Sequence, residues 1–138
     1  YIYLAMKRFQ DAKKLFEGVC ELAPKHDVPL VALSNVYFTQ NKYLEAIRIL
    51  KKAIKDNPDS AYAYVHLAES QLFYGKRDDA FKSMEKAMEL EPEGKSGDFA
   101  KSLKELADKG YDPVQLRKDT KKNIAEKVKN LKEEEKKK

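Results

Sequence analysis

The chain has 138 residues, of which 42% are hydrophobic and 37% charged, and it carries a formal net charge of +5 at pH 7. Five glycines and five prolines are too few for a collagen-like or linker composition, and no apolar run approaches the roughly 18 residues of a membrane span. A single cysteine excludes an internal disulfide and favours a reducing compartment, for which we expect the cytoplasm. The length and the many helix-forming residues indicate one globular, helical domain.

Prolines interrupt the chain at equal intervals, at Pro24, Pro58 and Pro92. Proline cannot continue a helix, so each one ends a helical stretch. Each interval carries a small, a large and a small or β-branched residue at spacings of four and three, which place them on one helical face. These residues are Ala12, Phe16 and Val19; Ala46, Leu50 and Ala53; and Ala80, Met84 and Ala87. The pattern predicts two helices per interval, with turns near 24–27, 40–42, 58–60, 74–77 and 91–97.

The repeating pattern fails after Pro92. The segment 98–109 reads as a helix that carries Phe99, Leu103 and Leu106 and ends at Gly110, where glycine tolerates the left-handed conformation. A last helix is expected from Pro113, and its thin apolar stripe comprises Leu116, Thr120, Ile124, Val128 and Leu131. The basic excess lies in this C-terminal part, where residues 95–138 hold 14 Lys or Arg against nine Asp or Glu.

The pattern resembles the tetratricopeptide repeat, a helix-turn-helix unit of about 34 residues. Residues 27–60 match it at eight positions and residues 61–94 at seven, with Gln71 where tyrosine is usual. Residues 1–26 form a partial repeat that keeps Tyr3, Ala12, Phe16 and Pro24 but lacks most of its first helix, so we expect a fragment or missing upstream residues. The resemblance implies an all-α fold, an α-solenoid of tetratricopeptide helix-turn-helix repeats over 1–94. A C-terminal capping helix (95–111) and a further C-terminal helix with a basic tail (112–138) complete the expected organisation.

In this family the inner faces of the first helices line a concave groove that holds a peptide or helix. Carried over position by position, the expected partner-binding residues are Val31, Asn35, Phe38, Tyr62, Val65, Glu69, Leu72 and Phe73, with Tyr1, Leu4 and Val28 beside them. Asn35 falls where many repeats hold a partner's backbone. The family's Lys/Arg clamp for terminal carboxylates is not matched, which favours a partner anchored by apolar side chains. The alternative is that the stripe from Leu116 to Leu131 fills the groove.

No residue pattern indicates catalysis, a metal or another cofactor. His26 and His66 lack a second ligand at metal spacing, and Cys20 falls at a helix-packing position. The stretch 93–97, EGKSG, lacks the earlier glycine and the strand of a phosphate-binding loop. The basic tail interleaves acidic residues and has no aromatic, so we expect neither a nucleic-acid nor a membrane partner.

The sequence therefore predicts a non-enzymatic scaffold or adaptor that binds a protein or peptide partner and has no small-molecule substrate. Two alternatives stay open. The strings KLFEGVCEL and HLAESQLFYG resemble the translocator chaperones of type III secretion. The second alternative is that the chain forms an accessory repeat domain of a larger enzyme or multidomain protein. Self-association also stays open.

Overall fold

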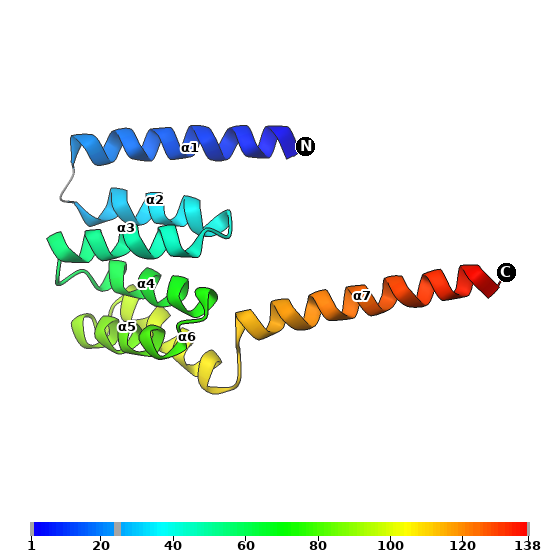
Figure 1. Ribbon diagram of the computed structural model, residues 1–138. Coiled ribbons are helices and arrows are strands. Elements are labelled where there is room, and N and C mark those ends of the chain that lie inside the picture. The colour runs from blue at the N-terminus through cyan, green and yellow to red at the C-terminus, as the bar shows by residue number, and fades with distance from the viewer. Residues whose placement is uncertain (1, 24–25, 138) are drawn as a thin grey trace.

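The computed structural model describes residues 2–23 and 26–137, and this part of the chain consists of helices joined by short turns (Figure 1). The all-α fold predicted from the sequence is confirmed, with no strand in the described residues. The turn predicted at 24–27 falls partly on residues 24 and 25, outside that part. The helices are α1 (Ile2–Leu22), α2 (Asp27–Thr39), α3 (Tyr43–Asp56), α4 (Ala61–Tyr74), α5 (Arg77–Leu90), α6 (Lys95–Asp108) and α7 (Pro113–Lys137).

Two helical hairpins, α2–α3 and α4–α5, form the centre of the stack. Each hairpin turns through a residue in the left-handed conformation, Asn41 with φ 63° and Gly75 with φ 101°. The N–H of Gly75 donates to the carbonyl of Gln71 at 3.0 Å, which satisfies the last turn of α4. Ser60 begins α4: its hydroxyl accepts from the N–H of Ala63 at 3.1 Å and donates to the Asp27 carboxylate at 2.6 Å. This second bond ties the start of α4 to the start of α2.

The small and large residues that recur in each interval, which we call the repeat skeleton, form the core between these helices. The three skeleton residues of α3 and the three of α5 are all 0% exposed: Ala46, Leu50 and Ala53, and Ala80, Met84 and Ala87. Opposite them, the small residues Ser34 of α2 and Ala68 of α4 are 1% and 0% exposed. Because these side chains are small, the paired helices approach closely.

Gln71 occupies a position where tyrosine was expected, and a buried polar pair accounts for it. The hydroxyl of Ser83 on α5 donates to the side-chain oxygen of Gln71 on α4 at 2.7 Å, and both residues are buried. A buried polar atom is costly unless it is hydrogen-bonded, so the two residues stabilise each other across the hairpin.

Helix α1 differs from the predicted partial repeat. The expected match of Tyr3 to Tyr37 placed the chain's start in a first helix, but Ile2–Leu22 is one continuous helix. The counterpart of Asn41 and Gly75 is Lys7, a good helix former that does not favour a left-handed turn. Because the chain does not turn at Lys7, α1 forms no hairpin of its own. Among the described helices, α1 packs only against α2.

Helix α6 closes the other end of the stack by packing on α4 and α5. It begins at Lys95, earlier than the predicted residue 98, because Gly97 fits directly against the preceding turn: a Cβ there would collide with the Glu91 carbonyl oxygen. Of the predicted stripe only Leu103 is buried, while Phe99 and Leu106 are 44% and 53% exposed. Besides Leu103, the packed face of α6 uses the small residues Gly97, Ala100 and Ala107.

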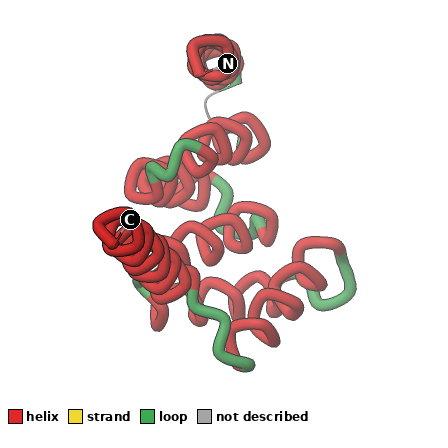
Figure 2. The backbone as a smooth tube through the Cα atoms, turned by 90° about the vertical axis from the view of Figure 1, so that its right-hand side faces the viewer, coloured by secondary structure: helices red, strands yellow, loops and turns green. Residues whose placement is uncertain are grey.

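Helix α7 leaves the stack as a long arm, and in the view turned by 90° it points toward the viewer (Figures 1 and 2). Asp112 accepts from the N–H groups of Val114 and Gln115 at 3.1 and 3.2 Å and so begins the helix. Among the described helices its backbone comes close to α4 alone, and the side chain of Arg117 in its first turns also reaches Tyr43 of α3. Its stripe is exposed, with Ile124 at 57% and Leu131 at 61%. The alternative that this stripe fills the groove is therefore wrong.

Candidate functional site

Helices α2, α4 and α6 are the first helices of successive units, and α4 packs against both of the others. The side chains that these helices present beside α4 are the candidate site. We call this surface the inner face and define it by Tyr62, His66 and Glu69 of α4 and Phe99 of α6.

Three rings form the centre of the inner face. The ring of Tyr62 meets His66 edge-on with centroids 4.9 Å apart, one helical turn along α4. Phe99 reaches His66 from α6, nearly parallel, at 6.2 Å. Tyr62 is 37% and Phe99 44% exposed, so both rings keep free surface on either side of the more buried imidazole. This arrangement can pack against an apolar or aromatic side chain.

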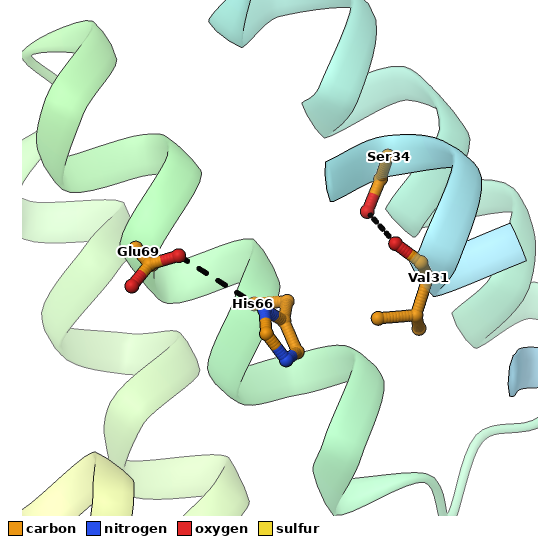
Figure 3. A network of polar contacts seen from close by, with 4 residues as sticks. All are labelled: Val31, Ser34, His66 and Glu69. Atoms are coloured by element: carbon orange, nitrogen blue, oxygen red, sulfur yellow. Dashed lines mark hydrogen bonds and ion pairs between the residues drawn. The ribbon is translucent and has the colours of Figure 1, made fainter. Parts of the chain in front are cut away.

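His66 and Glu69 form a polar pair in the partly buried part of the inner face (Figure 3). The Nδ1 atom of His66 lies 4.0 Å from a carboxylate oxygen of Glu69, and this buried nitrogen has no hydrogen-bond partner in the described residues. Burial lowers the pKa of His66 below 6.5 and raises the pKa of Glu69 above 4.5. Figure 3 also shows the side chain of Val31 pointing from α2 toward the imidazole.

Three of the predicted groove residues belong to the core. Val31 is 0% exposed, and Val65 and Leu72 are each 2% exposed. Val31 lies in the apolar cluster between α2, α3 and α4, and the other two lie in the cluster between α4, α5 and α6. The expectation that these side chains meet a partner is corrected by this packing.

Phe38 and Phe73 are half-buried and contact each other across α2 and α4. Their centroids lie 4.9 Å apart, and Tyr43 of α3 completes a cluster at 5.2 and 5.6 Å from them. The guanidinium of Arg117, from the first turns of α7, lies 5.0 Å from the centroid of Tyr43 and donates to the Phe73 carbonyl at 2.5 Å. Phe38 and Phe73, which were expected to contact a partner, thus pack against other side chains of the same molecule.

Asn35 lies apart from the inner face, in a hollow between α1 and α2. This hollow measures about 640 Å³ and is lined mainly by apolar side chains, among them Phe9, Ala12 and Phe16 of α1 and Ala32 and Val36 of α2. The structure therefore divides the eight predicted residues between the core, the aromatic cluster, the hollow and the inner face. Tyr62 and Glu69 are the two that it brings together at the inner face.

The sequence prediction did not assign His66, Phe99 or Tyr43 to a defined site. Phe99 shares a helical stripe with Leu103 in the sequence, and periodicity alone does not show which side of a helix is covered. Tyr43 and Arg117 lie far apart in the sequence, so no local pattern connects them.

Within the described residues, no group of His, Cys, Asp and Glu side chains is arranged to hold a metal ion. None of the helices in that part is both long and apolar enough to cross a membrane. The inner face consists of three ring side chains and the pair formed by His66 and Glu69.

The arrangement of paired helices in repeating units defines the class of protein. A sequence profile of the tetratricopeptide repeat matches residues 3–68 and, overlapping it, 37–94. The chain belongs to the tetratricopeptide repeat family, whose repeats form protein-interaction modules.

Individual relatives share this fold. Hsp70-Hsp90 organizing protein 1 of Glycine max is 33% identical over 103 residues, which are 75% of this chain and 18% of that protein. The first repeat domain of Spaghetti, solved with the HSP90 peptide SRMEEVD, superposes with a TM-score of 0.64 at 20% identity over 77% of this chain and 82% of that one. The type III secretion translocator chaperone SycD of Yersinia enterocolitica gives 0.63 at 20% identity, covering 77% of each chain. The chain spans less than a fifth of the length of the curated relatives it matches.

Proposed function

We propose that the chain is a non-enzymatic adaptor that binds a peptide or helix of a partner protein on the inner face. The single observation that carries this proposal is the pair of exposed rings, Tyr62 and Phe99, held on either side of His66. Exposed aromatic side chains gathered on one surface are typical of interaction sites. The likeness to a repeat domain solved with a bound peptide supports the same reading.

The inner face favours a neutral or basic segment over an acidic one. Glu69 is the one side chain of the inner face with an acidic group, and the four residues that define the surface include no Lys or Arg. A carboxylate brought close to Glu69 is repelled, more strongly because that site is partly buried. The peptide SRMEEVD bound by Spaghetti carries three acidic residues, so we expect this chain to select a different sequence.

A peptide library displayed on phage tests the proposal. We expect enrichment of peptides with an aromatic or large apolar residue and few Asp or Glu. Replacing both rings, Tyr62→Ser with Phe99→Ser, should weaken binding of an enriched peptide at least tenfold, because each half-exposed ring contributes on the order of 1 kcal/mol.

The matched control is Tyr74→Ser, because Tyr74 is 43% exposed on the same helix but lies outside the inner face. This variant should bind normally. If the double variant also binds normally, or if SRMEEVD binds as tightly as the enriched peptides, the proposal fails.

A further inference from the structure

We propose that the carboxylate of Glu69 binds the guanidinium of one arginine in the partner segment. The inference rests on the proposed function, because it names the charged residue that accompanies the apolar anchor of a segment on the inner face. The observation that carries it is a partly buried carboxylate beside exposed rings, with no Lys or Arg nitrogen within 4.0 Å of it among the described residues.

Glu69 has acceptor atoms without a matching cation. Its side chain is 23% exposed, and the polar contact that the described part of the chain gives it is the Nδ1 atom of His66 at 4.0 Å. Burial lowers the pKa of His66 below 6.5, so near pH 7 the imidazole is mainly neutral and does not offset the charge of the carboxylate. A partly buried carboxylate without a cation is costly, and a cation supplied by a partner removes that cost.

The repeat itself does not require an acidic residue at this position. One repeat earlier the same position of the first helix holds Asn35, and one repeat later it holds Leu103. Both are uncharged, so the packing of a first helix accepts a neutral side chain there. A local choice that costs stability and serves no packing role is expected at a functional site. We therefore attribute the charge of Glu69 to binding.

The surroundings of Glu69 favour arginine over lysine. Tyr62 and Phe99 contact the imidazole beside Glu69, and both rings are partly exposed. A guanidinium is flat and weakly hydrated, so it can stack on a ring and also donate two hydrogen bonds to a carboxylate. The ammonium of lysine is compact and strongly hydrated, so it loses more water on entering a partly buried site.

The helix sets the distance between the arginine and the apolar anchor of the segment. Tyr62 and Glu69 lie two turns apart on one face of α4, which is about 10 Å along the helix axis. An extended chain spans that length in about three residues. We expect the arginine within about three residues of the aromatic or large apolar residue.

Parallel selections with the wild type and Glu69→Gln from the phage-displayed peptide library test this inference. Glutamine keeps the shape of the side chain and removes its charge. Burial raises the pKa of Glu69 and so disfavours its ionised form, which means that the variant should unfold in urea no earlier than the wild type. We expect arginine to be enriched near the apolar residue on the wild type. On the variant this enrichment should disappear while the apolar residue stays enriched.

Fluorescence anisotropy with one wild-type-selected peptide then measures the pair directly. Glu69→Gln should weaken binding of the arginine peptide at least tenfold, because the guanidinium loses its carboxylate. The same peptide with glutamine in place of arginine should bind both proteins alike, and the peptide with lysine should bind the wild type more weakly than the arginine peptide. Glu85→Gln, which changes an exposed acidic residue of α5, is the matched control and should bind as the wild type does.

The outcomes separate this inference from the proposed function. Equal enrichment of arginine on the wild type and Glu69→Gln, or no enrichment on either, overturns the inference. Equal affinity of the lysine and arginine peptides overturns it as well. In these cases the proposed function stands if Tyr62→Ser with Phe99→Ser still weakens binding. Normal binding by that ring variant contradicts the proposed function, and this inference with it.

Discussion

Close helix contact at the repeat skeleton depends on single alanines. Ala46 is 0% exposed between α3 and its neighbours, so Ala46→Leu adds three carbons where no space exists. We expect it to lower the free energy of unfolding by about 1–3 kcal/mol in urea denaturation. Lys52→Leu, on the exposed side of the same helix, should change it by less than about 0.5 kcal/mol. The opposite ranking would contradict the assigned helical phase.

His66 should make stability depend on pH. Burial lowers its folded-state pKa below 6.5, so under pH 6.5 the unfolded chain binds a proton that the folded chain resists. The free energy of unfolding should therefore decrease as the pH is lowered through that window, by at most about 1.4 kcal/mol per pH unit. Glu69 acts in the opposite direction: its raised pKa means that its burial costs less as the pH falls toward 4.5.

Urea denaturation at several pH values between 7.5 and 5.5 measures the histidine effect. His66→Phe should flatten the dependence, since the new ring can still pack beside Tyr62 and Phe99. His26→Gln, which changes an exposed histidine, should leave the dependence as in the wild type. Parallel curves for His66→Phe and the wild type would exclude His66 as the source.

At the scale of the helix, the root of α7 should matter more than its length. Arg117 reaches both Tyr43 and the Phe73 carbonyl, whereas the residues beyond it are exposed. We expect Arg117→Ala to lower the free energy of unfolding by roughly 0.5–1.5 kcal/mol. Removal of residues 118–138 should change it little, and Lys118→Ala serves as the matched substitution. A large loss on truncation alone would show that the arm contributes contacts absent from this structure.

The helices and their pairing were predictable because their determinants are local and repeated. Proline spacing, the alanine positions and Gly75 each act within one or two turns of helix. The site was less predictable. Whether Phe38 faces a partner or Phe73 depends on contacts between helices, and the burial of Val31 depends on the rotation of its helix against two others. Nothing in the repeat period reports those rotations.

At the scale of the whole molecule, stability should follow position in the stack. Each helix contacts mainly its neighbours, as is usual in repeat proteins. Within the described part of the chain, helix α4 packs against α2, α3, α5, α6 and α7, whereas α1 packs against α2 alone. Hydrogen exchange should therefore be slowest in α4 and α5 and fastest in α1 and the outer part of α7. Uniform protection would contradict this gradient and indicate a single cooperative unit.

The hydrogen bond between Gln71 and Ser83 has a consequence for how the repeats assemble. Similar neighbouring units can exchange helices while they fold, which is a known failure of repeat chains. In this chain such an exchange would set Gln71 against Ile49, the counterpart of Ser83 on α3, and leave a buried amide unpaired at a cost of about 1–3 kcal/mol. The reverse exchange would place the bulkier Tyr37 against Ser83. The Gln71–Ser83 pair therefore stabilises the correct α4–α5 hairpin over hairpins with exchanged helices, and it lends specificity to the pairing of two similar repeats.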